Sequence, residues 1–399
     1  MIVGVVGKAN VGKSTFFKAA TLAEVEIANY PFATIDPNTG VGHVKVKDPA
    51  LDFDKVSNPR TGFVLKDSRF VGVQMIDVAG LVPGAHEGHG MGNQFLDDLR
   101  QADVLIHVID VAGSTNEKGE PITPGSYDPA NDVKFLEVEL DMWYLGILKK
   151  GWEKFARTVM QEKAEIHLAL GKQLSGLGVT ENMVEDTIKK LGFDKEKPNT
   201  WTAEDLKSLA TSLRKQTKPM IIACNKIDIP GAKENYEKLK TQFTGHTFVA
   251  CSAESELALR EAAKAELIEY VPGDDTFLNL NQERMNEKQK AALEFIRQNI
   301  LEKFGTTGVQ QTLDQAVFNV LKYIAIFPGG VSKLEDSEGR CLPDCFLMPE
   351  GTTALDFAYK LHTDFGKKFI CAKDVRTKMT VGKEHLLKHS DIVEIVAGK

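Results

Sequence analysis

The chain has 399 residues, of which 42% are hydrophobic and 26% are charged, a composition that excludes an intrinsically disordered protein. Its net charge of −7 excludes polyanion binding by bulk electrostatics, and its odd number of cysteines, five, favours reduced thiols. No run approaches the roughly 18 apolar residues of a membrane span, and the first residues do not resemble a signal peptide. At roughly 150 residues per domain, we expect a cytoplasmic, monomeric protein of two or three domains with no membrane partner.

The first predicted elements are a buried strand over residues 2–6 and a helix that begins near Ser14. The segment between them fits the phosphate-binding pattern G-x-x-x-x-G-K-S/T. Its glycines let backbone N–H groups turn toward an anion, and the N-terminus of the helix adds its dipole. We expect Lys13 to bridge the outer phosphates and the Ser14 hydroxyl to bind Mg²⁺. The predicted phosphate-binding residues are Gly7, Lys8, Ala9, Asn10, Val11, Gly12, Lys13, Ser14 and Thr15.

A second buried strand is predicted over residues 70–76, and it ends in the segment Asp77-Val78-Ala79-Gly80. A carboxylate at a strand end beside a phosphate loop can hold Mg²⁺, usually through water. The backbone amide of Gly80 can contact the γ-phosphate. We therefore predict that Asp77 binds the metal and that Gly80 and Lys13 take part in catalysis.

A long insertion is predicted between Asp77 and Asn225, which lie 148 residues apart in the chain. The elements that separate two such motifs need only about 60 residues, so about 90 are extra. After a strand over residues 104–110 and a loop over 113–129, apolar residues recur at helical spacing. The pattern predicts an inserted helical domain over residues 128–216, with its tryptophans in a core rather than on a partner-facing surface.

The next predicted strand, over residues 220–224, leads into Asn225, Lys226 and Asp228. The Asp228 carboxylate can accept hydrogen bonds from N1–H and the 2-amino group of guanine, whereas adenine would leave it unpaired. A further strand over residues 247–250 leads to Ser252 and Ala253, whose backbone amides we expect on the guanine carbonyl. An ATP-using enzyme is the main alternative, and Asp228 argues against it.

These motifs follow one another at the carboxyl ends of successive strands, which places them in one crevice of a parallel sheet. We predict an α/β fold of the P-loop NTPase type, with a mostly parallel, doubly wound sheet. The predicted nucleotide domain is discontinuous, over residues 1–127 and 217–275. A helical extension over residues 276–330 follows, with helices near 293–304 and 317–324.

The last 69 residues, 331–399, form a separate predicted α+β domain. Strands are predicted over residues 345–348, 369–372 and 392–396. Between the first two, Thr353 caps a helix that we expect to end at Gly366. The result is a small sheet that packs on one helix. This segment resembles the TGS domain, a ubiquitin-like (β-grasp) fold found in threonyl-tRNA synthetases and several translation GTPases.

Three longer strings identify a protein family more specifically than the phosphate loop does. They are N-Y-P-F-A-T-I-D-P-N at residues 29–38, D-V-A-G-L-V-P-G-A at residues 77–85, and residues 87–96. With them the chain resembles the Obg-related GTPases, in the branch of the Obg-like ATPases and their archaeal relatives. The resemblance covers the nucleotide domain and the C-terminal segment well and the middle poorly. Members of the ATP-preferring branch replace the guanine-binding motif, whereas this chain keeps it. The resemblance implies a ribosome or RNA partner.

The resemblance also implies roles for single residues. Thr34 is the candidate for closing over Mg²⁺ and the γ-phosphate, and so for metal binding and catalysis, with Thr39 as a weaker alternative. Leu81 occupies the position where many regulatory GTPases carry a water-orienting glutamine, which predicts slow hydrolysis. Asn10 either bonds its own loop or helps bind K⁺ near the transferred phosphate. His86 and His89 lie among glycines, which favours a mobile second switch over a metal site.

The function predicted from these observations is slow, Mg²⁺-dependent hydrolysis of GTP to GDP by a nucleotide-dependent switch that acts on the ribosome. The first alternative is an RNA- or ribosome-binding module in which hydrolysis is incidental. The second is an ATP hydrolase. RNA contact is expected through basic residues of the C-terminal domain, namely Lys367, Lys368, Lys373, Arg376 and Lys378.

Overall fold

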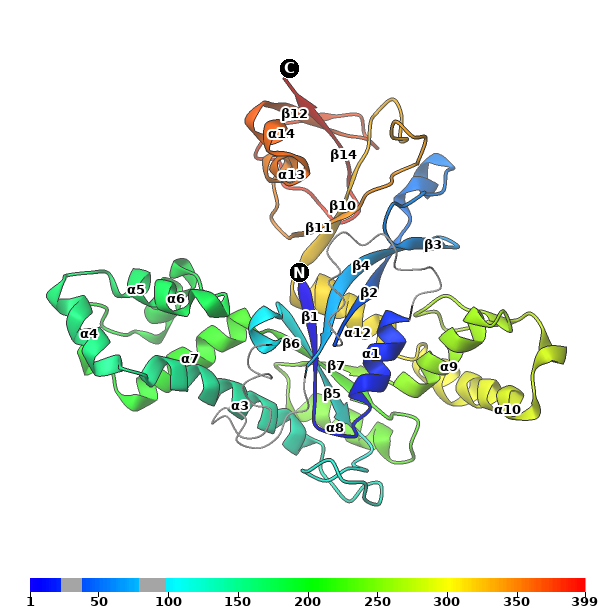
Figure 1. The fold of residues 1–399 in the computed structure, drawn as a ribbon, viewed down its shortest axis with the longest axis horizontal. Helices are drawn as coiled ribbons and strands as arrows, with labels where there is room; N and C mark the ends of the chain where they lie inside the picture. Colours follow the sequence, from blue (N-terminus) through cyan, green and yellow to red (C-terminus); the bar gives the residue numbers. More distant parts are fainter. Residues whose placement is uncertain (23–37, 79–97, 399) are drawn as a thin grey trace.

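The structure is a computed structural model that describes residues 1–22, 38–78 and 98–398 (Figure 1). Within these residues the central sheet has the strand order β2-β4-β1-β5-β6-β7, and β3 pairs with β4. Its strands are β1 (Ile2–Val6), β2 (Thr39–Lys47), β3 (Phe63–Leu65), β4 (Ser68–Asp77), β5 (Val104–Asp110), β6 (Met220–Asn225) and β7 (Thr247–Ala250).

The central strands are continuous apolar runs, as expected for a parallel sheet that is covered on both faces. Every residue of β5 is buried, and β1 pairs in parallel with both β4 and β5. One face packs on α1 (Lys13–Thr21) and α12 (Val309–Gln315) through residues such as Phe16 and Leu313. Leu99 and Leu136 belong to a second core on the other side of β1 and β5. The predicted α/β class and the mostly parallel sheet are confirmed.

Five α-helices between β5 and β6 form an arm that projects to one side of the sheet (Figure 1). Their bounds are α3 (Ala130–Lys149), α4 (Trp152–Gln161), α5 (Ile166–Leu174), α6 (Glu181–Leu191) and α7 (Ala203–Thr217). Helices α3 and α7 pack side by side as the stem of this helical arm, where Arg214 donates to Asp141 at 2.7 Å. Trp152 stacks on Trp201 with ring centroids 5.5 Å apart, and both rings are buried. The predicted helical insertion and its tryptophan core are confirmed.

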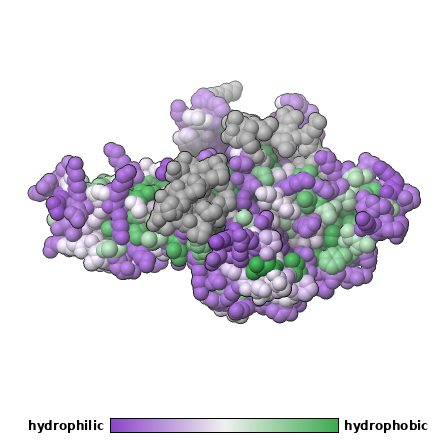
Figure 2. Space-filling model, turned by 60° about the horizontal axis from the view of Figure 1, so that its bottom comes forward, coloured by the Kyte–Doolittle hydropathy of each residue, from purple (hydrophilic) through white to green (hydrophobic). Residues whose placement is uncertain are grey.

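A further group of helices follows β7 and lies on the opposite side of the sheet from the arm (Figure 1). It comprises α9 (Ala253–Lys264), α10 (Glu287–Ile296) and α11 (Glu302–Phe304), with the short hairpin β8 (Ile268–Glu269) and β9 (Leu278–Asn279). Helix α8 (Ala232–Gln242) precedes β7 in the chain and packs on it. On the face shown in Figure 2, hydrophilic residues predominate and hydrophobic residues occur in smaller groups. Among the helices that the structure describes, none combines the length and the apolar character needed to cross a bilayer.

The C-terminal domain is a second sheet with the order β11-β10-β14-β12-β13, packed on α13 (Ala354–Leu361) and α14 (Thr363–Lys367). Its strands are β10 (Tyr323–Pro328), β11 (Phe346–Pro349), β12 (Phe369–Asp374), β13 (Thr380–Val381) and β14 (Ile392–Ala397). Thr353 caps α13 by accepting from the backbone N–H of Asp356, as predicted. The expected small sheet on a helix is confirmed.

Two sequence predictions in this region are wrong. The helix expected over residues 317–324 ends in a π-helical turn (Ala316–Val320), and Ile324 belongs to β10, between β11 and β14 in the second sheet. A short apolar run fits a buried strand as well as a helix. Here the run is a strand because it pairs with β11 and β14. Gly366 does not end the first helix, because α13 stops at Leu361 and Gly366 lies inside α14. A Cβ at Gly366 would lie 2.2 Å from the Tyr359 ring, so a close helix contact explains this glycine.

Strand β4 of the central sheet contacts the C-terminal domain through a side chain. At its start, Arg69 is buried and donates to the carbonyl oxygens of Leu342 and Pro343 in the segment between β10 and β11. Arg60 adds an ion pair to Asp336 at 2.7 Å. At its other end, β4 carries Asp77, so one strand connects the C-terminal domain with the predicted metal site.

Candidate nucleotide-binding site

The phosphate loop lies between β1 and α1, where the sequence predicts it. Two of its glycines are required by their surroundings: a Cβ at Gly7 would lie 2.5 Å from the Val108 carbonyl oxygen, and one at Gly12 would lie 2.2 Å from Asn225 Nδ2. Gly12 also has φ +91°, in the left-handed region that favours glycine. The loop thus reaches the start of α1 with its backbone curled at the helix N-terminus, the arrangement that binds phosphates.

Lys13, Ser14 and Asp77 meet at the start of α1. The Lys13 ammonium donates to Asp77 Oδ1 and, at 2.7 Å, to the Val78 carbonyl oxygen. Ser14 Oγ donates to Asp77 Oδ2 at 3.2 Å. A hydroxyl and a carboxylate oxygen are ligands that Mg²⁺ prefers, and the ion usually takes its other ligands from water and phosphates. These residues therefore fit a Mg²⁺ ion that arrives with a nucleotide.

No cluster of three or more His, Cys, Asp or Glu side chains suited to a metal occurs in the described part of the chain. Thr34 and Gly80 lie outside the described residues, as do Leu81, His86 and His89. Thr39 begins β2 opposite Ile76, and the Asp77 amide donates to the Asn38 carbonyl oxygen at 2.7 Å. The chain that follows residues 23–37 therefore returns directly beside the predicted metal site.

Asn225 lies between the phosphate loop and the loop after β7. Its Nδ2 donates to the Val11 carbonyl oxygen at 2.8 Å, and its Oδ1 accepts from the Ala253 amide at 2.9 Å. Asp228 accepts from Ser252 Oγ at 2.9 Å. The structure thus brings Asn225, Asp228, Ser252 and Ala253 together, as the sequence motif implies.

The two backbone amides expected on the guanine carbonyl are engaged within the protein. The Ser252 amide donates to the Thr307 carbonyl oxygen at 2.8 Å, and the Ala253 amide donates to Asn225. Ser252 contributes instead through its hydroxyl, which holds one oxygen of Asp228 in place. The sequence does not reveal that the Ser252 amide is engaged, because its partner Thr307 lies in a distant loop.

Asp110 is a site residue that the sequence analysis missed. Its side chain is fully buried at the end of β5, beside Asn225 on β6. It accepts from Lys226 Nζ at 2.9 Å, and also from Ser114 Oγ and Thr115 Oγ1. Lys226 adopts the left-handed conformation (φ 64°), and this ion pair fixes its side chain. The available signal was an aspartate at the carboxyl end of a largely apolar strand, the position where such sheets bind ligands.

Other residues of the phosphate loop contact the segment before the helical arm. The Lys8 side chain is buried and points away from the loop, to Asp132 at 2.9 Å. Asn10 is exposed, and its Nδ2 donates to the Gly119 carbonyl oxygen at 2.9 Å rather than to its own loop. Ala9 is exposed, whereas Val11 is buried and Thr15 is half-buried.

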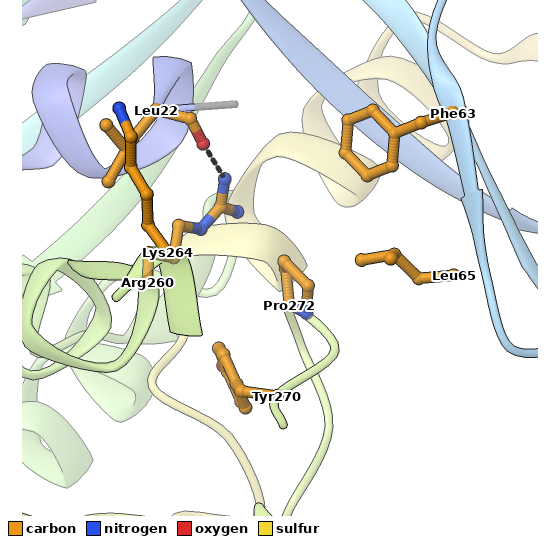
Figure 3. A pocket seen from close by; sticks show the side chains of 7 residues that line it. All are labelled: Leu22, Phe63, Leu65, Arg260, Lys264, Tyr270 and Pro272. Carbon is orange, nitrogen blue, oxygen red and sulfur yellow. Dashed lines mark hydrogen bonds between the residues drawn. The ribbon is translucent and has the colours of Figure 1, made fainter. Parts of the chain in front are cut away.

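The end of α1 is fixed by Arg260 of α9 (Figure 3). Its Nη1 donates to the Leu22 carbonyl oxygen at 3.1 Å, and its Nε donates to the fully buried Glu256 at 2.6 Å. Figure 3 shows this guanidinium pointing to Leu22 across a small pocket. The pocket is also lined by Phe63, Leu65, Lys264, Tyr270 and Pro272.

Comparisons with known proteins place the chain among GTP-binding proteins. Three family models match successive parts of the chain: a 50S ribosome-binding GTPase over residues 2–135, the G4 motif-containing domain of YGR210-like Obg-like GTPases over 223–330, and the TGS domain over 335–397. The chain is 47% identical to an uncharacterized GTP-binding protein of Methanocaldococcus jannaschii over 99% of both chains. It is 32% identical to the ribosome-binding ATPase YchF of Bacillus subtilis, over 66% of this chain and 69% of that protein. A crystal structure of a GTP-binding protein from Pyrococcus horikoshii aligns over 100% of both chains with a TM-score of 0.80 and 38% identity.

Proposed function

This chain belongs to the Obg-like, YchF-type family of GTP-binding proteins, and from that premise we propose that it is a slow, Mg²⁺-dependent GTPase. In this proposal the protein changes conformation between its GTP and GDP states and acts on the ribosome. One observation carries it: Asn225 bonds directly to the loop that presents Lys13 and Ser14, on one side, and to Ala253 beside Asp228, on the other. The segment that would bind the triphosphate and the segments that would bind the base are therefore linked through the Asn225 side chain.

The choice of guanine rests on Asp228. One of its oxygens accepts from Ser252, so the carboxylate is held in place while the other oxygen can accept from the base. Guanine offers donors at N1 and at its 2-amino group, whereas adenine has an acceptor at N1, which a carboxylate repels. YchF relatives are named ATPases, so ATP hydrolysis is the competing function. Asn225, Lys226 and Asp228 favour GTP for this chain.

For hydrolysis, Lys13 would neutralise the phosphate oxygens, while Ser14, Asp77 and Thr34 would hold Mg²⁺, which would supply further positive charge to the reacting phosphates. With Leu81 in place of a water-orienting glutamine, we expect turnover on the order of 10⁻³ s⁻¹ without a partner. A K⁺ ion at Asn10 is a second proposed cofactor. The Asn10 Nδ2 is bonded to Gly119, which leaves its Oδ1 as the oxygen for a cation.

The ribosome is the proposed partner because a matched family model and the YchF relatives carry ribosome-binding names. Four of the five predicted RNA contacts, Lys367, Lys368, Lys373 and Lys378, lie on the C-terminal domain with exposed or half-buried side chains. Arg376 is engaged within the protein, since it donates to Asp52 at 2.8 Å and to the Ser390 carbonyl oxygen at 2.7 Å. We therefore omit Arg376 from the proposed RNA contacts.

Single-turnover hydrolysis of labelled GTP, with and without ribosomes, tests the proposal. A switch predicts that ribosomes accelerate the reaction and that ribosome pull-down differs between GTP, GDP and nucleotide-free protein. The alternative, a binding module with a structural nucleotide, predicts unchanged kinetics and equal pull-down in all three states. The second result would overturn the proposed switch.

A further inference from the structure

The phosphate loop is tied to the first helix of the arm by a buried ion pair. Lys8 is only 5% exposed, and its ammonium lies 2.9 Å from Asp132 Oδ1, in the first turn of α3. It also donates to the Thr115 carbonyl oxygen at 3.1 Å and lies 3.9 Å from the centre of the Tyr127 ring. The Tyr127 hydroxyl donates to Asp132 at 3.0 Å. A side chain of the nucleotide-binding motif is therefore used to hold the base of the arm.

The segment just before α3 touches the same loop at a second point. Gly119 has φ +79°, and a Cβ there would lie 2.6 Å from the Ala9 carbonyl oxygen. Asn10 donates to the Gly119 carbonyl oxygen. The loop backbone from Lys8 to Asn10 is thus held by the chain that enters the arm.

The other end of the arm is anchored to the nucleotide domain as well, before the first residues of β5 and β6. Lys218, directly after α7, is buried and donates to the carbonyl oxygens of Arg100 at 3.0 Å and Ala102 at 2.6 Å, at the end of the helical residues 98–101. Arg214 of α7 bonds to both Asp141 and Glu137 of α3, so the stem is one packed pair. A tilt of this stem would therefore move both Asp132, which contacts Lys8, and Lys218, which contacts Ala102.

A buried ion pair resists separation, because loss of one partner leaves an uncompensated charge away from water. Burial raises the pKa of Asp132, while the Lys8 ammonium opposes that shift. The loop and the first turn of α3 are therefore expected to move together rather than separately.

We propose that Asp132 is a positioning residue for the phosphate loop: it fixes Lys8, and with it the backbone that binds the phosphates. Because energetic coupling is reciprocal, a partner that docks on the helical arm would change nucleotide affinity, and nucleotide would change the arm by the same factor. The inference rests on the proposed function, since it requires a nucleotide in the loop.

Three variants test this assignment by calorimetry with Mg-GTP and Mg-GDP. Asp132→Asn keeps the shape of the side chain and removes its charge, and we expect about tenfold weaker binding of both nucleotides. Lys8→Met combined with Asp132→Asn removes both charges, and it should recover part of the lost affinity because no buried charge remains unpaired. Asp141→Asn is the matched control, since it removes the charge from a partly buried ion pair of the same stem away from the loop. It should lower the unfolding midpoint without changing nucleotide affinity.

Hydrogen exchange supplies a readout that a merely structural role would not change. In the wild-type protein, Mg-GTP should slow amide exchange in residues 128–140, and this effect should be lost in Asp132→Asn. Nucleotide affinity of Asp132→Asn within twofold of wild type, or an equal loss in Asp141→Asn, would overturn the inference while leaving GTP binding intact. Failure of the wild-type protein to bind any nucleotide would instead overturn the proposed function, so the two failures are distinguishable.

Discussion

Asn225 Nδ2 lies 2.8 Å from the carbonyl oxygen of Val11, so one buried amide joins the base-binding motif to the phosphate loop. The same side chain accepts from the Ala253 amide and thereby holds the loop after β7. Three segments from distant parts of the sequence are thus fixed by two hydrogen bonds. Base recognition and phosphate binding are expected to respond together to changes at this position.

Asn225→Ala should weaken GTP binding by at least about tenfold, since it leaves the Val11 carbonyl and the Ala253 amide without this partner, at about 1–3 kcal/mol for each buried group. Calorimetry with Mg-GTP measures the affinity, and urea denaturation measures the free energy of unfolding. Asn235→Ala is a suitable control, because Asn235 also donates to a backbone carbonyl, that of Val111 at 2.9 Å. Equal losses of GTP affinity in both variants would contradict the connecting role of Asn225.

The assigned metal residues predict how Mg²⁺ affects nucleotide binding. Adding Mg²⁺ should strengthen GTP binding by the wild-type protein, and EDTA should reverse the effect. Ser14→Ala and Asp77→Asn should each reduce this enhancement, since the first removes a hydroxyl oxygen and the second removes the negative charge of the carboxylate. Thr21→Ala on the same helix is the control, because its hydroxyl donates within α1, to the Phe17 carbonyl oxygen at 2.8 Å. An enhancement that persists in both site variants would argue against the assigned ligands.

Asp314 predicts a pH dependence of stability. Burial raises its pKa to about 7, although the Lys45 amide and Gln310 donate to it and the charges of Lys45 and Arg260 lie nearby. Between about pH 4 and pH 7 the folded protein keeps a proton that the unfolded chain has released, so this group's contribution to stability falls as the pH rises. The total change is up to about 4 kcal/mol.

Urea denaturation of the wild-type protein and Asp314→Asn across pH 4.5 to 8 measures this contribution. The wild type should lose stability relative to the variant as the pH rises to about 7, with no further change above that value. Burial lowers the pKa of His43 to about 4 and of His107 to about 3. The contribution of these two histidines to stability therefore rises with pH, opposite to that of Asp314. Both histidines are present in the two proteins, so their effect cancels in the difference. A difference that does not change with pH would disprove the assignment.

The proposed K⁺ ion predicts faster single-turnover hydrolysis in potassium than in sodium salts of equal concentration. A cation near Asn10 would stabilise negative charge that develops on the transferred phosphate. Asn10→Ala should remove the difference between the two salts. Equal wild-type rates in potassium and sodium would eliminate the cation proposal.

Much of the sheet could be predicted from the sequence because its strands are continuous apolar runs. The predicted strands over residues 104–110 and 247–250 coincide with β5 and β7. Strand β10 could not be predicted, because its apolar run also fits a helix until β11 and β14 pair with it.

Within the site, the motifs gave the residues that lie next to one another in sequence or at strand ends. The motifs did not predict pairs that are distant in sequence: Lys226 and Asp110 are 116 residues apart, and Lys8 and Asp132 are 124 apart. The motif also suggested that Lys8 and Ala253 face the nucleotide. Their observed partners, Asp132 and Asn225, depend on tertiary contacts that no local pattern encodes.

The identity of the nucleotide is tested most directly by calorimetric titration of the wild-type protein with Mg-GTP and, separately, Mg-ATP. Pairing of the Asp228 carboxylate with the donors of guanine predicts that GTP binds at least about 100-fold more tightly. Equal dissociation constants for the two nucleotides would contradict a guanine-specific switch.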